Sequence, residues 1–172
     1  QIAAGEVVNR PESVAKELIE NSIDSDATEI TLIVKDSGKS LIQVIDNGSG
    51  MTEEDAILSF RRHSTSKISS INDLERISTL GFRGEALASI CSISQIEMKT
   101  RLQSEDVGSY IKIEGDEVQQ VSKTSCDLGT SISVRNIFYN TPARRNFLKS
   151  DNTEFRHIYE TFVKLAISNP DI

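Results

Sequence analysis

Residues 28–46, TEITLIVKDSGKSLIQVID, contain two runs rich in β-branched residues with the short segment DSGK between them. This pattern predicts a β-hairpin, because a short glycine-containing turn joins antiparallel neighbours. Parallel strands would need a connection of about a dozen residues or more. The hairpin is the strongest constraint on the fold, since it disfavours a doubly wound parallel sheet.

Helical patterns lie on both sides of this hairpin. Upstream, Pro11 occupies a plausible first helical position, and apolar residues follow it at helical spacing: Val14, Ala15, Leu18, Ile19 and Ile23. Downstream, Thr52 and the acidic residues after it predict a short capped helix. The basic, serine-rich segment 61–70 predicts a loop, and a further helix-like run begins near Glu85.

The second half of the chain alternates between apolar and polar residues. This alternation predicts four strands, at residues 95–101, 109–115, 117–123 and 130–138. Thr141 followed by Pro142 predicts a capped helix start, and residues 153–168 predict a last helix. The order of elements predicts a single α/β (α+β) sandwich over residues 1–172, with a mixed sheet.

Composition limits the functions open to the chain. At 172 residues with 37% hydrophobic content, it is long enough for one domain with a substantial core. A formal net charge of -7 argues against a nucleic-acid footprint over the whole surface. Cys91 and Cys126 lack disulfide-framework or zinc spacing, and no apolar run approaches the roughly 18 residues of a membrane span. We therefore expect a soluble intracellular protein, and the lack of an initiator Met suggests a fragment.

Glu17 and Asn21 form an i,i+4 pair at one edge of the apolar arc of the first helix. They could be ordinary boundary residues. They could also act together, because a carboxylate can accept a proton from an attacking water and an amide oxygen is a suitable ligand for Mg²⁺.

Asp46 closes the second strand of the hairpin and begins the segment DNGSGM, residues 46–51. An acceptor at an apolar strand end is costly to bury unless a donor meets it, and the exocyclic amine of a purine is such a donor. Gly48 and Gly50 would let the backbone approach a flat ligand. A plain Asx turn explains the same residues, so the segment alone leaves both interpretations open.

The segment GFRGEAL places Gly81 and Gly84 before a helix start, where free backbone amides and the helix dipole can receive phosphate. It is neither a Walker A motif nor a GxGxxG fingerprint, so a P-loop enzyme is disfavoured. A simple glycine-rich helix cap is the alternative. Lys67 could add charge to the same phosphates or could be a solvated loop residue.

Taken together, KELIENSIDSDA, DNGSGM and LGFRGEAL resemble the first three motifs of the GHKL ATPases, the superfamily of gyrase, the ninety-kilodalton heat-shock chaperone, sensor histidine kinases and MutL. The flanking segments QIAAGEVVNRP, TSKI and FYNTPARRNFL are similar to MutL-type mismatch-repair proteins in particular. The resemblance covers essentially the whole chain. It implies a Bergerat fold, a two-layer sandwich of a mixed, mostly antiparallel sheet with helices on one face.

The resemblance also implies roles for individual residues. Glu17 would be the general base, Asn21 the Mg²⁺ ligand and Asp46 the acceptor for the adenine amine. The other residues implied in ATP binding are Gly48, Gly50 and Met51 on the adenine side, Thr65 and Lys67 in a lid over 61–83 that is mobile when empty, Gly81, Phe82, Arg83, Gly84, Glu85, Ala86 and Leu87 at the phosphates, and Thr130, whose hydroxyl supports Asp46.

The implied function is slow, Mg²⁺-dependent ATP hydrolysis that drives homodimerisation and gating of DNA and other repair proteins, in a bacterial-type cytoplasmic or nucleoid-associated protein. A nucleotide-dependent interaction module with incidental hydrolysis, and a chaperone-like or kinase member, are the alternatives. A general base at Glu17 favours the first. A following domain and an amino-terminal arm would complete the site.

Other polar residues are expected to have ordinary roles. His63 and His157 lack partners at catalytic spacing. Arg144 and Arg145 could contact DNA or the γ-phosphate side of a partner, or form a helix-start ion pair. Glu20 should lie further toward solvent than Glu17, which makes it the poorer candidate for the base.

Overall fold

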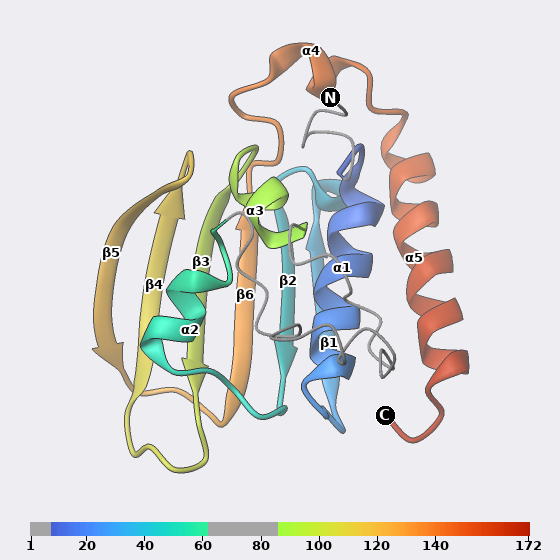
Figure 1. Ribbon diagram of the computed structural model, residues 1–172. Coiled ribbons are helices and arrows are strands. Elements are labelled where there is room, and N and C mark those ends of the chain that lie inside the picture. Colours follow the sequence, from blue (N-terminus) through green and yellow to red (C-terminus); the bar gives the residue numbers. More distant parts are fainter. Residues whose placement is uncertain (1–7, 62–85) are drawn as a thin grey trace, which may run out of the picture.

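The computed structural model describes residues 8–61 and 86–172 (Figure 1). The helices are α1 (Pro11–Asp24), α2 (Glu53–Leu58), α3 (Ala86–Cys91), α4 (Pro142–Asn146) and α5 (Asp151–Ser168), with a 3₁₀ turn η2 (Asp36–Gly38). The strands are β1 (Ile30–Lys35), β2 (Leu41–Asp46), β3 (Gln95–Arg101), β4 (Gly108–Glu114), β5 (Glu117–Thr124) and β6 (Gly129–Arg135). The predicted hairpin is confirmed, because β1 and β2 pair antiparallel across η2.

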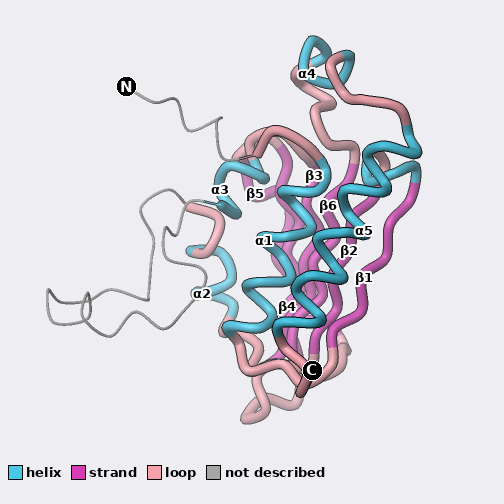
Figure 2. The backbone as a smooth tube through the Cα atoms, turned by 90° about the vertical axis from the view of Figure 1, so that its right-hand side faces the viewer, coloured by secondary structure: helices cyan, strands magenta, loops and turns pink. Residues whose placement is uncertain are grey.

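The six strands form one sheet in the order β1-β2-β6-β3-β4-β5. Every pairing between them is antiparallel, so the parallel component expected of a mixed sheet is not found among the described strands. The long helices α1 and α5 cover one side of the sheet, as the edge-on view shows (Figure 2). This arrangement confirms the predicted two-layer sandwich.

The helix-facing side of the sheet is built in rows that run across the strands. Residues that pair directly across antiparallel strands lie on the same face. The first row contains Ile42, Val134, Ile96 and Ile113, and the second contains Val44, Ile132, Met98 and Ile111. All eight side chains are buried, so these two rows form the floor of the hydrophobic core.

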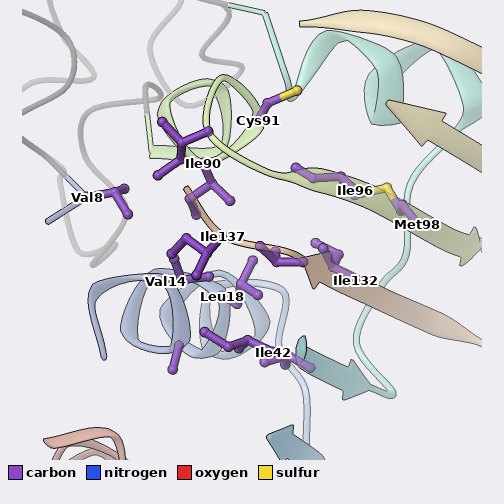
Figure 3. Packing of buried hydrophobic residues seen from close by; sticks show 14 of the residues in the cluster. Val8, Val14, Leu18, Ile42, Ile90, Cys91, Ile96, Met98, Ile132 and Ile137 are labelled. Atoms are coloured by element: carbon purple, nitrogen blue, oxygen red, sulfur yellow. The ribbon is translucent and has the colours of Figure 1, made fainter. Parts of the chain in front are cut away.

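Helix α1 forms the opposite wall of the core. Its predicted apolar face is confirmed, since Val14 and Leu18 are buried and Ile23 packs against the same cluster. Figure 3 shows Leu18 of α1 in one cluster with Ile42 of β2. Helix α5 packs beside α1, and the two helices together cover the β1–β2 side of the sheet.

Strand β6 is shorter than predicted. It ends at Arg135, whereas the alternating pattern suggested a strand as far as Phe138. Asn136 and Phe138 have positive φ angles of 50° and 63°, which no β-strand contains. The amide of Phe138 donates to the carbonyl of Ile93 (2.7 Å), and both Ile137 and Phe138 are fully buried. The chain leaves the sheet here because these side chains reach the core only after the backbone turns.

The two carboxy-terminal helices also differ in detail from the prediction. Thr141 holds the N-cap position of α4, but its hydroxyl makes no capping hydrogen bond and is buried without a partner. Helix α5 begins at Asp151, two residues before the predicted start. Its first turn is fixed by Glu154, whose Oε1 accepts from the backbone amide of Lys149 (2.8 Å), and Lys39 pairs with Asp151.

Cys91 and Cys126 are both free thiols. None of the helices described is both long and apolar enough to cross a membrane.

Ile42→Ala should destabilise the fold by about 2–5 kcal/mol, because Ile42 is 0% exposed in the first apolar row and its truncation leaves a cavity. Denaturant unfolding followed by circular dichroism measures the change. Ile167→Ala is the matched control, since Ile167 on α5 is 74% exposed and should lose less than about 0.5 kcal/mol. Equal losses in the two variants would show that the core does not lie where this packing places it.

Candidate functional site

A third row, entirely polar, follows the two apolar rows at one end of the sheet. Asp46 of β2 pairs with Thr130 of β6, Thr130 with Thr100 of β3, and Thr100 with Ser109 of β4. Thr100 and Ser109 are each 1% exposed, so the row is sealed at its β4 end, while Asp46 is only partly buried. The hydrophobic core thus ends at a line of hydrogen-bonding groups that opens at Asp46.

The Asp46 carboxylate is held by donors from three directions. Its Oδ1 accepts from the backbone amides of Gly48 (3.0 Å) and Thr130 (3.2 Å), and its Oδ2 accepts from the Ser22 hydroxyl of α1 (2.8 Å). A carboxylate has about four acceptor positions, so one position on Oδ2 remains for another donor. Oδ1 therefore makes the Asx turn with Gly48, and the remaining position on Oδ2 is open to a ligand.

The glycines after Asp46 are required by the protein itself. A Cβ on Gly48 would lie 2.1 Å from the Ser25 hydroxyl, and a Cβ on Gly50 would lie 2.1 Å from the Arg101 carbonyl. Gly50 also has a φ of +69°, whereas Gly48 does not have a positive φ. Close packing against α1 and β3 thus explains both glycines without a ligand. The reason expected from the sequence was different, namely close approach of the backbone to a flat ligand.

Glu17 and Asn21 lie one turn apart on α1, and both are partly buried. Asn21 directly precedes Ser22, the residue that bonds Asp46, so α1 connects the pair to the polar row. Within residues 8–61 and 86–172, neither the Glu17 carboxylate nor the Asn21 amide makes a side-chain hydrogen bond or ion pair. Both groups are therefore free to interact with a ligand.

Burial raises the pKa of Glu17, since desolvation disfavours its charged form. Lys16 opposes this shift and Glu20 adds to it. Lys16 is bonded to both oxygens of Glu20, at 2.9 Å each, and Glu20 is 7% exposed. The expectation that Glu20 faces solvent is therefore wrong, because its pairing with Lys16 one turn earlier lets the carboxylate be buried. Glu17 is therefore the carboxylate of α1 that is left without a partner in the part of the chain that the structure describes.

The remaining predicted residues divide between described and undescribed parts of the chain. The amide of Met51 donates to the Thr100 hydroxyl (2.9 Å), which fixes the end of the DNGSGM segment to the polar row. Ala86 and Leu87 begin α3, which packs against α1. Thr65 and Lys67, the lid over 61–83 and the residues Gly81, Phe82, Arg83, Gly84 and Glu85 lie outside the described residues, except that Arg61 is described.

Thr130 reaches Asp46 in a different way from the one expected. The resemblance implied support through its hydroxyl, but the contact is made by its backbone amide. Its hydroxyl is 3.0 Å from that of Thr100 instead. The hydroxyl that does bond Asp46 belongs to Ser22, which the sequence reasoning missed.

Signals for the missed residues were present in the sequence. Ser22 lies four residues after Leu18 and therefore falls on the apolar face of α1, where a serine is out of pattern. Thr100 lies two residues after Met98 and therefore on the same strand face as the core. In both cases a polar residue on an apolar face marked a buried hydrogen bond.

The chain matches the model of a family described as Histidine kinase-, DNA gyrase B-, and HSP90-like ATPase, over residues 9–138. This match covers most of the chain. The chain belongs to this family, the GHKL ATPases. Asp46, Gly48 and Gly50, together with Glu17 and Asn21, lie within the matched residues of this GHKL ATPase domain.

Comparison with individual proteins assigns the GHKL domain to one branch of the family. It is 56% identical over all 172 residues to the DNA mismatch repair protein MutL of Chloroherpeton thalassium and 55% identical to that of Christiangramia forsetii. The chain covers 27% and 28% of these two proteins, so it spans just over a quarter of their length. The resemblance to the MutL branch is therefore confirmed.

Solved structures agree with this placement. The GHKL domain is similar to the Aquifex aeolicus MutL ATPase domain complexed with ADP, with a TM-score of 0.76 and 34% identity over 96% of this chain and 58% of that one. It is also similar to the N-terminal domain of a DNA repair protein, with a TM-score of 0.82 and 31% identity over 99% of this chain and 49% of that one. The predicted fold is confirmed.

Gly50→Ala and Gly115→Ala should separate the two reasons why a position requires glycine, which are a positive φ and a lack of space for a Cβ. Both residues have positive φ, but a Cβ on Gly115 meets only the Tyr139 hydroxyl at 3.4 Å. Gly115→Ala should therefore cost about 1 kcal/mol from backbone strain alone. Gly50→Ala should cost an additional 1–3 kcal/mol, roughly, because its Cβ overlaps the Arg101 backbone. Urea unfolding compares the two, and equal costs would contradict the close packing at Gly50.

Glu17→Gln should stabilise the protein at neutral pH. Because the folded state raises the pKa of Glu17 above the ordinary value of 4.5, the folded state binds the proton more tightly than the unfolded state. The stability that Glu17 contributes is therefore present below pH 4.5 and is lost as the pH rises through the pKa of Glu17 in the folded state. The free energy of unfolding of Glu17→Gln, relative to the parent, should rise from about pH 4 to about pH 7.

Glu29→Gln is the matched control, since Glu29 is exposed before β1. Its free energy of unfolding at neutral pH should differ from that of the parent by less than about 0.5 kcal/mol. A Glu17→Gln variant that is less stable than the parent at neutral pH would contradict the assignment of Glu17 as a desolvated, unpaired carboxylate.

Proposed function

We propose that this chain binds ATP with the adenine amine at Asp46 and the phosphates toward Glu17 and Asn21, and hydrolyses it slowly with Mg²⁺. The observation that carries the proposal is the single acceptor position left on Asp46 Oδ2, beside the Ser22 hydroxyl. Similarity to a MutL ATPase domain that was solved with ADP supports nucleotide binding.

The adenine end is selective because its acceptor is preorganised. The two backbone amides and the Ser22 hydroxyl already hold the carboxylate, so it does not have to reorient when an amine arrives. A donor at the remaining position would gain a charge-assisted hydrogen bond in a partly buried setting. A 6-oxo purine would present an acceptor to this carboxylate and would be repelled.

At the other end, Glu17 is suited to act as a general base. Its pKa is raised toward neutral pH, as a general base requires. The absence of a side-chain partner among the described residues leaves both oxygens available to a water. The ammonium of Lys16 is bonded to both oxygens of Glu20, so Lys16 does not form an ion pair with Glu17. Proton acceptance by Glu17 would strengthen the water as a nucleophile toward the terminal phosphate.

Asn21 fits the role of magnesium ligand. Its neutral amide oxygen is a hard donor, it lies one turn from Glu17, and its side chain is not used by the fold in the described residues. One protein ligand is enough for a cation that keeps several waters and binds phosphate oxygens. When bound, Mg²⁺ would neutralise charge on the phosphates. The segment 81–87, with Thr65 and Lys67, completes the proposed phosphate side and lid.

We further infer that the domain acts in DNA mismatch repair, where ATP binding drives homodimerisation and hydrolysis resets contacts with other repair proteins. The proteins named MutL that match the whole chain support this inference. With a net charge of -7, the chain itself would contact DNA only weakly. A cytoplasmic, nucleoid-associated location fits this role. An unpaired base at Glu17 favours hydrolysis over an interaction module that only binds nucleotide.

Asp46→Asn should weaken binding of a non-hydrolysable ATP analogue by about 10- to 100-fold, since it replaces the free acceptor with a donor. The fold should survive, because the retained oxygen can still accept from the two amides and the Ser22 hydroxyl can accept instead of donate. Calorimetric titration with Mg²⁺ measures the affinity. The parent should prefer the ATP analogue to its inosine counterpart, and Asp46→Asn should lose this preference.

Glu17→Ala is the companion variant, because it should retain analogue binding and lose about 10²- to 10⁴-fold in ATP turnover. Phosphate release under single-turnover conditions measures this loss. If the parent and both variants bind alike and hydrolyse alike, the site has been placed on the wrong residues. Loss of binding in both variants would contradict the assignment of adenine recognition to Asp46 and of the chemical step alone to Glu17.

A further inference from the structure

The hydroxyl of Thr100 lies at the centre of the polar row and contacts three groups. It accepts from the amide of Met51 (2.9 Å), lies 3.2 Å from the carbonyl of Gly129, and lies 3.0 Å from the hydroxyl of Thr130. Thr100 is 1% exposed, so water does not compete for these contacts. Thr100 therefore joins the DNGSGM segment, through Met51, to β6, through Gly129 and Thr130.

Donor and acceptor capacity fixes the direction of these bonds. A hydroxyl has one proton and two acceptor positions. The Gly129 carbonyl can only accept, so the Thr100 proton satisfies it, and the Thr130 proton then satisfies Thr100. The reverse direction would leave the Gly129 carbonyl without this bond. The arrangement that satisfies every contact therefore commits the Thr130 proton to Thr100.

This direction decides which groups face the open end of the row. With its proton committed, the Thr130 hydroxyl presents only acceptor positions, as does the remaining position on Asp46. Thr130 and Asp46 pair directly across β6 and β2, so their side chains share one face. Among the described residues, Thr130 and Asp46 thus each offer an acceptor position at the open end. Two acceptors suit the amine of adenine, which has two protons, and disfavour the oxygen of a 6-oxo purine in the same place.

We propose that Thr100 is a positioning residue that determines purine specificity, by holding the Thr130 hydroxyl as an acceptor beside Asp46. The proposal rests on the adenine site proposed above and names a residue outside it. Thr100 does not touch the base, because it is covered on β3 between Thr130 and Ser109. Its effect passes through the proton of Thr130.

Removal of the Thr100 hydroxyl should release that proton. In Thr100→Val, which conserves shape, the Thr130 hydroxyl can rotate and donate outward, so a 6-oxo purine gains a donor. The preference for the ATP analogue over its inosine counterpart should fall about tenfold, mainly through tighter binding of the inosine nucleotide. Thr100→Ser keeps the hydroxyl and should restore the preference of the parent.

The test measures both affinities by calorimetry in the parent, Thr100→Val, Thr100→Ser and Thr161→Val. Thr161 is the matched control, since its buried hydroxyl donates to Glu12 (2.7 Å) between α5 and α1, away from the polar row. Thr161→Val should lower stability without changing the ratio of the two affinities. Thermal unfolding of each variant records the purely structural cost.

Two results would overturn the proposal, and they are distinguishable. If Asp46→Asn loses the preference and Thr100→Val keeps it, Thr100 only stabilises the fold and the adenine site stands. If the parent itself shows no preference between the two nucleotides, the adenine site fails, and the role of Thr100 fails with it. A reduced ratio in Thr100→Val that Thr100→Ser restores would confirm the proposal.

Discussion

The structure depends on how the carboxylate of Asp46 is satisfied at the end of an apolar sheet face. A buried acceptor without donors is costly, so the chain must bring donors to it. They come from α1 through Ser22, from β6 through the Thr130 amide and from the local turn through Gly48. These bonds fix α1 over β2, and Asn21 directly precedes the Ser22 that makes one of them. One side chain therefore aligns the helix, the sheet and the open end where a ligand can bind.

A different balance holds at Glu17. The fold gives this carboxylate no partner in the described residues and raises its pKa by burial, which disfavours the charged form at neutral pH. The neighbouring carboxylate Glu20 is equally acidic in type but is neutralised by Lys16. Helix α1 thus carries a paired carboxylate, Glu20, and a carboxylate without a partner in the described residues, Glu17, which is the proposed base. Perturbed, unpaired groups of this kind are concentrated at functional sites because folding alone does not favour them.

The sequence predicted those features that depend on local periodicity. The helix from Pro11, the hairpin and the strand faces follow from spacing alone, and the positions of Glu17, Asn21 and Asp46 follow from them. Features that depend on partners distant in sequence were missed. Strand β6 ends early because Ile137 and Phe138 are drawn into the core, and Glu20 is buried because Lys16 neutralises it. The hydroxyl network of Ser22, Thr100 and Thr130 required the register of three strands and one helix.

The position of the polar row explains how specificity and chemistry can be separated in one small domain. The row continues two rows of buried aliphatic side chains, so Thr100 and Thr130 have the rigidity of the core itself. Donors and acceptors held this firmly discriminate between ligands, because they cannot rotate to suit the wrong one without losing a bond. Glu17 and Asn21 lie on the rim of α1 and are held by no such network within residues 8–61 and 86–172. In the proposed function, recognition is therefore built into the sheet, while the residues proposed for the chemical step would be free to meet phosphate, metal and water.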